Sequence, residues 1–245
     1  MNYKRGQLTI FIIISIFVIG LILLFFVISD GLIKWPFSAE SDPIYVFVHD
    51  CAEKEGIKTV YNIGLNGGYY FKPNLSTESN IPIYYKDGIN YMPSKEDVER
   101  EIFFSMNESL FLCTKSFIDF PELNISQGKI RTKTKMTDKK VVLDITYPIY
   151  ISKGESTTLI QDFKVEVPVR MKTVYESISR YMDQQMNFET ICLSCLLDIS
   201  LENDLYVDMM DYDDETTIFI FRDENSKINN ETFIWVFANK YEVEK

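Results

Sequence analysis

The most regular hydrophobic pattern in the chain is an apolar run from Leu8 to Ile28 that contains no charged residue. A helix rises about 1.5 Å per residue, so a run of this length covers about 30 Å, the thickness of a bilayer's hydrocarbon core. The pattern therefore predicts a transmembrane helix at 8–28, between a short tail at 1–7 and a linker at 29–42.

The flanks of this run predict its orientation. Lys4 and Arg5 precede it, and the positive-inside rule places that end in the cytoplasm. The run is longer than the apolar region of a secretory signal, and no Ala-x-Ala site follows it, which favours an uncleaved anchor. The remaining chain is then expected outside the cell, attached to the cell membrane by a single pass.

Three later segments place apolar residues at helical spacing. The segment that starts at Ser94 has the sequence of a capping box. The Ser94 side chain can accept from the backbone amide of Asp97, and the Asp97 side chain can accept from the backbone amide of Ser94. The first ends at Asn66-Gly67-Gly68, where glycine supplies the positive φ that a helix exit needs. The predicted helices are 43–62, 94–115 and 171–186.

Two other regions alternate apolar and polar residues with a period of two, which is typical of strands. Between 69 and 91 we expect a loop with short extended pieces, and Ile191 to Ile199 is a short apolar stretch. Strands grouped in runs imply antiparallel pairing, so we predict an α+β domain over 43–245, of order ααβββαβββ, with a sub-boundary near 170. The predicted strands are 129–135, 141–147, 163–167, 205–210, 217–221 and 232–238.

Charge narrows the choice of partners. The chain carries a formal charge of −11; Lys4, Arg5, Lys34 and Asp30 give +2 in the first 35 residues, which leaves −13 for the remainder. Nucleic acid and anionic lipid both need a basic face, so this composition argues against both. A hydrophobic content of 46% with 14% aromatic residues indicates a packed core.

The predicted external location determines what is expected of the four cysteines. Disulfides persist outside the cell, and Cys51 and Cys113 lie on the apolar sides of two predicted helices, so we expect a bridge there, with buried free thiols as the alternative. Cys192 and Cys195 form a C-x-x-C pair, which suits a redox couple, part of a zinc site or a structural disulfide. We expect the structural disulfide.

Other chemistry is sparse. His49 is the only histidine, which leaves little room for Ser/His/Asp or Cys/His catalysis, and we expect neither a catalytic residue nor a cofactor or metal. The acidic run from Asp208 to Glu215 lacks the calcium-loop spacing and is expected at a solvated hairpin tip. Four Asn-x-Ser/Thr triplets fit an external glycoprotein, although such triplets also arise by chance. Their asparagines are Asn74, Asn107, Asn124 and Asn230.

The N-terminus from Lys4 to Phe11 resembles those of archaeal single-pass membrane proteins and the class III signals of archaeal type IV pilins. The pilin resemblance implies processing between Gly6 and Gln7. That family carries glutamate at the fifth mature position, where this chain has Phe11. Downstream, the likeness to archaeal single-pass proteins rests on Cys51, Gly64-Leu-Asn-Gly-Gly-Tyr-Tyr70, Ile81-Pro-Ile-Tyr-Tyr85, Pro93-Ser94 with Glu99, and Cys113.

Three functions are compatible with these features. The first is a membrane-anchored extracellular domain with a structural or interaction role at the archaeal cell surface, bound to a protein partner or self-assembled. The second is a pilin-like filament subunit. The third is an extracytoplasmic thiol-disulfide oxidoreductase that uses Cys192 and Cys195.

Overall fold

The computed structural model describes residues 14–21, 42–154, 156–228 and 230–241. The chain divides into a unit at Met1–Pro43 and a second at Ile44–Lys245. Residues 14–21 are helical with exposed side chains. Within the described residues no helix reaches the length and hydrophobicity needed to cross a membrane. The rest of the predicted span, the Gly6–Gln7 processing site and linker residues 29–41 lie outside them.

Two long helices form one part of the second unit. The capping box predicted at Ser94 is present: its side chain accepts from the Asp97 amide, and the Asp97 carboxylate accepts from the Ser94 amide. A disulfide joins Cys51 to Cys113, as predicted, with a Cα–Cα distance of 5.8 Å. The helices are α2 (Pro43–Leu65) and α3 (Lys95–Thr114), followed by the short 3-10 turn η2 (Lys115–Phe117).

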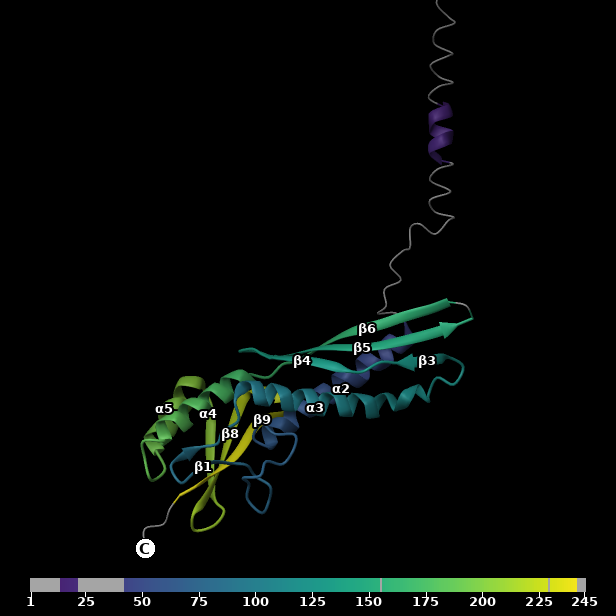
Figure 1. The fold of residues 1–245 in the computed structure, drawn as a ribbon. Helices are drawn as coiled ribbons and strands as arrows, with labels where there is room; N and C mark the ends of the chain where they lie inside the picture. Colours follow the sequence, from purple (N-terminus) through teal and green to yellow (C-terminus); the bar gives the residue numbers. More distant parts are fainter. Residues whose placement is uncertain (1–13, 22–41, 155, 229, 242–245) are drawn as a thin grey trace, which may run out of the picture. The chain divides into compact units, whose positions relative to one another are not determined.

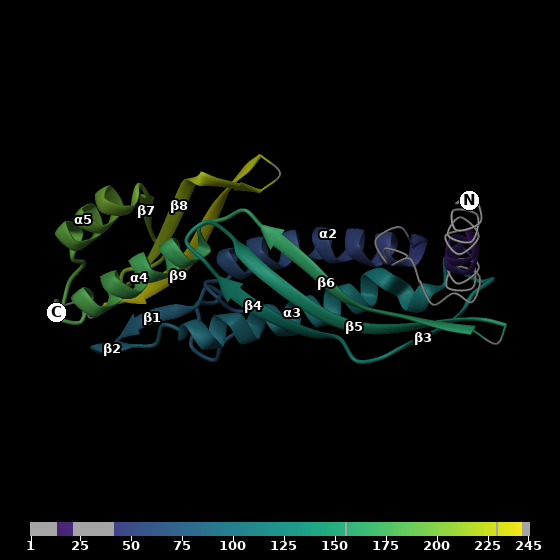
Figure 2. The same cartoon turned by 90° about the horizontal axis from the view of Figure 1, so that it is seen from above.

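The first sheet runs along this helix pair (Figures 1 and 2). Its long central strand, β5, pairs along one edge with β6 and along the other with β3 and β4 in turn, all antiparallel. Alternate β5 side chains are buried, which is the period expected of a sheet with one face on a core. The strands are β3 (Asn124–Gln127), β4 (Arg131–Met136), β5 (Val141–Lys153) and β6 (Ser156–Val167).

The second sheet has the order β2-β1-β9-β8-β7. Its pairs are antiparallel except β1 with β9, which is parallel. Two further helices lie beside it in Figures 1 and 2. The elements are β1 (Ile83–Lys86), β2 (Ile89–Asn90), α4 (Met171–Gln185), α5 (Leu193–Asn203), β7 (Tyr206–Asp211), β8 (Thr216–Ile228) and β9 (Glu231–Lys240).

Helix α2 packs on both sheets through glycine. A Cβ at Gly56 would lie 3.0 Å from Leu143 of β5, and one at Gly64 would lie 2.4 Å from the Ile234 carbonyl oxygen of β9. Both sheets therefore share one core with this helix. That core is strongly aromatic beneath β9, where the indole of Trp235 donates to the Tyr84 hydroxyl over 3.1 Å.

The α+β class and the three long predicted helices are confirmed, and several details were wrong. The predicted order ααβββαβββ omits the β1–β2 hairpin, strand β3 and helix α5. Antiparallel pairing throughout was predicted, but β1 pairs in parallel with β9, a strand from the far end of the chain. The apolar stretch at 191–199 belongs mostly to α5, which continues to Asn203.

Candidate interaction surface

Helix α5 exposes a row of leucines. Leu193, Leu197 and Leu201 are 59%, 58% and 74% exposed. Residues four apart lie on the same side of a helix, so these side chains form one stripe, which we call the leucine face. Exposed apolar residues scattered singly need no explanation, whereas an aligned set is a candidate interaction surface.

The opposite side of α5 already supplies the packing that the helix needs. Cys195, Leu196 and Ile199 are buried. The leucine face is therefore a second apolar side, beyond what folding requires. A surface helix normally has a single apolar stripe, which faces the core, so a second apolar side is a candidate contact with other protein.

The N-terminal end of α5 is fixed by a disulfide and by a glutamine. Cys192 is the N-cap, bonded to Cys195, and its sulfur accepts from the Cys195 amide over 3.3 Å. Buried Gln185 of α4 accepts from the Cys192 amide over 3.0 Å and donates to the carbonyls of Phe188 and Thr190 over 3.1 and 2.8 Å. These bonds tie the α4–α5 connection to the end of α4.

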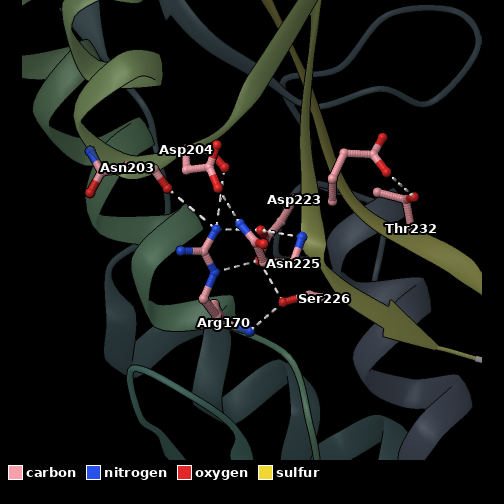
Figure 3. A network of polar contacts seen from close by, with 8 residues as sticks. Arg170, Asn203, Asp204, Asp223, Asn225, Ser226 and Thr232 are labelled. Atoms are coloured by element: carbon pink, nitrogen blue, oxygen red, sulfur yellow. Dashed lines mark hydrogen bonds and ion pairs between the residues drawn. The ribbon is translucent and has the colours of Figure 1, made fainter.

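The C-terminal end of α5 is held by Arg170 (Figure 3). Its guanidinium donates to the Asn203 and Asp204 carbonyls, each over 3.3 Å, where the last carbonyls of a helix lack internal partners. The same guanidinium pairs with the fully buried carboxylate of Asp223 in β8, with an Nε–Oδ2 distance of 3.1 Å. Hydrogen bonding to Asp223 raises the pKa of Arg170.

The network extends to β8 residues next to Asp223. The Ser226 hydroxyl donates to Asp223 and accepts from the Arg170 amide over 2.8 Å, while the Asn225 amide group donates to Asp204 over 2.6 Å (Figure 3). A buried carboxylate is tolerated only when it is paired and hydrogen-bonded in this way. With both ends tied, α5 presents the leucine face on a preorganised helix.

The rim of the leucine face is acidic. Helix α5 carries Asp198 and Glu202 and no basic residue, and Glu189 precedes it. Glu202 pairs with Arg180 of α4. Asp198 and Glu189 have no ion pair within the described part of the chain.

The chain passes from α5 into β7, the edge strand of the second sheet. Tyr206, Met209 and Met210 of this strand are exposed. Arg222 lies over the Tyr206 ring at 5.7 Å and pairs with Asp208 at 2.8 Å. An edge strand offers unpaired backbone groups, and a charge such as Asp208 is a common way of limiting uncontrolled pairing there.

The structure places the other predicted site residues apart from one another. His49 lies on α2, stacked on Tyr45 at 5.9 Å. Within the described residues no group of three or more His, Cys, Asp or Glu could hold a metal. Asn74, Asn124 and Asn230 are exposed, whereas Asn107 is half-buried and accepts from the Thr132 hydroxyl over 2.8 Å.

The cysteine prediction and the leucine face meet in α5. Both predicted cysteine pairs are disulfides, and Cys192 and Cys195 are largely buried. The leucine face itself was missed, although its signal, leucine at every fourth position, is present in the sequence. The predicted stretch ended at Ile199 and so excluded Leu201.

Comparison with known proteins adds no relative: no protein-family model, curated protein or solved structure matches this chain.

Proposed function

We propose that the chain is a membrane-anchored protein whose external domain binds another protein through the leucine face of α5. The apolar run at 8–28 and the preceding Lys4 and Arg5 support the anchor and its orientation. The observation that carries the interaction role is the leucine face: three aligned leucines, more than half exposed, on a helix tied at both ends.

The charge around the leucine face identifies the chemistry of the partner. A second copy of this chain would bring the acidic Asp198 toward its own counterpart, and like charges oppose such contact, whereas Glu202 is already paired with Arg180. A partner with an apolar stripe edged by lysine or arginine would find complementary charge. An amphipathic helix laid against the face supplies that pattern with anchors at i, i+4 and i+8.

The expected affinity is modest. Full burial of a leucine side chain is worth about 1.5–3 kcal/mol, so three partly exposed leucines offer about 3–5 kcal/mol before the cost of association. An 11-residue helix is about 16 Å long, which gives a contact smaller than a standard interface. We therefore expect a weak, reversible complex with a Kd on the order of 1 mM.

Two synthetic helices test this chemistry on the full chain in nanodiscs of zwitterionic lipid. Both carry leucines at i, i+4 and i+8; one is flanked by lysines and the other by glutamates. Fluorescence anisotropy, corrected with empty discs, should show binding of the lysine peptide alone.

A triple change of Leu193, Leu197 and Leu201 to Gln should abolish that binding. The matched control is Leu159→Gln, which alters an exposed leucine on β6 and should leave binding intact. Equal binding of both peptides, or binding that survives the triple change, would refute the proposed surface.

A filament subunit is the second candidate. Arg5-Gly6-Gln7 before the apolar run favours it, because this is the form of a class III signal. Intact mass of the native protein decides between the two: a chain that begins at Gln7 supports the filament subunit, and a chain that begins at or near Met1 argues against it.

A further inference from the structure

Helix α3 carries a second exposed surface, built around aromatic rings. Phe104, Asn107, Glu108 and Phe111 follow one another at i, i+3, i+4 and i+7, which places them on one side of the helix. With Phe71 and residues 128–130 they line a pocket of about 510 Å³. The pocket is open to solvent over much of its extent; its volume lies within the range of small-molecule sites, which are typically aromatic with a few polar groups.

The Phe71 wall of this pocket is held in place by two glutamates of α3. Glu101 accepts from the amides of Tyr70 and Phe71 over 2.9 and 3.0 Å, and Glu108 accepts from the Tyr70 hydroxyl over 2.9 Å. The Phe71 ring then meets Phe104 edge-on, with centroids 5.7 Å apart. These hydrogen bonds hold the loop at Tyr70 and Phe71 against α3 and so keep the Phe71 ring in contact with Phe104.

The opposite wall is also fixed by the backbone. Gly128 donates its amide to the Pro148 carbonyl over 2.7 Å. Asn107 accepts from Thr132 through its side-chain oxygen, so its NH₂ group is the part that has donors to offer a ligand. The pocket is therefore formed by three segments distant in sequence, each tied to the scaffold.

The polar lining offers one charge of each sign. Glu108 supplies a carboxylate and Lys129 an ammonium, and within the described residues neither forms an ion pair. Three phenylalanine rings, those of Phe71, Phe104 and Phe111, line the same pocket. Ring faces attract ammonium groups, especially methylated ones, because the ring quadrupole is negative at its face.

We propose that this pocket binds a small zwitterion. Its ammonium group would lie against the phenylalanine rings near Glu108, and its anionic group near Lys129 and the Asn107 NH₂ group. A ligand with both charges satisfies both side chains, whereas a simple cation would be repelled by Lys129 and a simple anion by Glu108. The inference does not depend on the leucine face, which lies on a different helix.

Ligand-observed NMR on the full chain tests this site in a polyoxyethylene detergent, which carries neither charge nor sugar. The probes are phosphocholine and glycine betaine, with tetramethylammonium, inorganic phosphate and glucose for comparison. The two zwitterions should bind with a Kd on the order of 1 mM, and the other three more weakly by about 3- to 10-fold.

Charge-neutralising variants give the sharper test. Glu108→Gln and Lys129→Gln should each weaken phosphocholine binding by about 3- to 10-fold, and Phe104→Leu should do the same while keeping an apolar side chain. Glutamine can still accept from Tyr70, so the loop is kept. Glu122→Gln and Lys133→Gln, which alter exposed charges outside the pocket lining, are the matched controls.

Several outcomes overturn the proposal. Stronger phosphocholine binding after Lys129→Gln, or tetramethylammonium binding as tight as phosphocholine, would identify a plain cation site. Glucose binding as tight as phosphocholine would identify a neutral polar site. Absence of binding for both zwitterions would remove the site altogether.

Discussion

Asp223 is a buried carboxylate. The Arg170 guanidinium neutralises its charge, and the Ser226 hydroxyl donates a hydrogen bond to it. Removing one partner of a buried pair is costly because it leaves the other charge without compensation. We expect Arg170→Ala, which leaves the fully buried Asp223 carboxylate without its counter-charge, to lower the free energy of unfolding by about 3–5 kcal/mol. Asp208→Ala, which breaks an exposed pair with Arg222, should cost about 0–1 kcal/mol. Urea unfolding followed by tryptophan fluorescence compares them; equal losses would contradict the role assigned to the Arg170–Asp223 pair.

Gly64 marks the close approach of α2 to β9. A methyl group there would lie 2.4 Å from the Ile234 carbonyl oxygen and 2.8 Å from the Phe233 ring. Overpacking of this kind costs about 1–3 kcal/mol, so Gly64→Ala should lower the free energy of unfolding by that amount. Asn62→Ala, at an exposed position of the same helix, should have little effect. Thermal unfolding of the two variants checks the expectation, and a Gly64→Ala variant as stable as the parent would contradict this packing.

Several buried tyrosines make the domain sensitive to alkali. Burial, with nearby carboxylates, raises the pKa of Tyr175 to about 12, and burial also raises the pKa of Tyr84 and Tyr181. A tyrosine whose folded-state pKa is raised stabilises the fold fully below its unfolded pKa of about 10 and loses that effect as pH rises toward 12. We therefore expect stability to fall between pH 10 and 12.

Tyr175→Phe provides the matched test of this pH dependence. Phenylalanine cannot ionise, so the variant should lose less stability between pH 10 and 12, although at neutral pH it lacks the hydrogen bond from the Tyr175 hydroxyl to the Pro93 carbonyl. Urea unfolding at pH 8, 10 and 11.5 measures both effects. An unchanged pH slope in the variant would remove Tyr175 from the explanation.

Single residues with strong local roles were predictable from the sequence. Ser94 and Asp97 form the expected capping box, because cap chemistry depends on residues three apart. The Cys51–Cys113 bridge followed from cysteines on the apolar sides of two helices. The pocket beside Asn107 was not predictable, since it needs Phe71 and Lys129 brought next to α3 by tertiary folding.

At the scale of elements, α5 was the least predictable helix. Its leucines and its buried residues point to opposite sides, so the helix lacks the single apolar stripe by which a surface helix is recognised. Strand β1 posed a different difficulty. Its partner β9 lies some 150 residues further on, and a local pattern of alternation contains no information about which strand pairs with which.

The Cys192–Cys195 disulfide is expected to order the start of α5. Changing both residues to Ser should speed hydrogen exchange in the first turn of α5 and leave α2 unaffected, since the bond closes only a short local loop.

The reactivity of the Cys192–Cys195 disulfide tests the oxidoreductase hypothesis. Both cysteines are largely buried, so in the folded protein we expect no alkylation after mild reduction. Rapid and selective alkylation of Cys192 would instead favour redox chemistry.

At the scale of the whole molecule, the acidic charge sets how partners approach. A formal charge of −11 attracts basic partners and disfavours anionic surfaces, and the effect weakens as salt shortens the range of electrostatic interactions. The fold class followed from the grouping of strands and helices, which is a global property of the pattern. The packing of both sheets on α2 could not be predicted from that pattern, because it depends on close tertiary contacts at Gly56 and Gly64.

The most direct test of the proposed function is a photo-crosslinking amino acid placed at Leu197 in the full chain, in intact cells. We predict an adduct whose mapped partner peptide has apolar residues at helical spacing flanked by lysine or arginine. The same amino acid at Leu159, an exposed leucine of β6, is the control and should not give that adduct. A Leu197 adduct with a second copy of this chain, or the same products from both positions, would contradict the account.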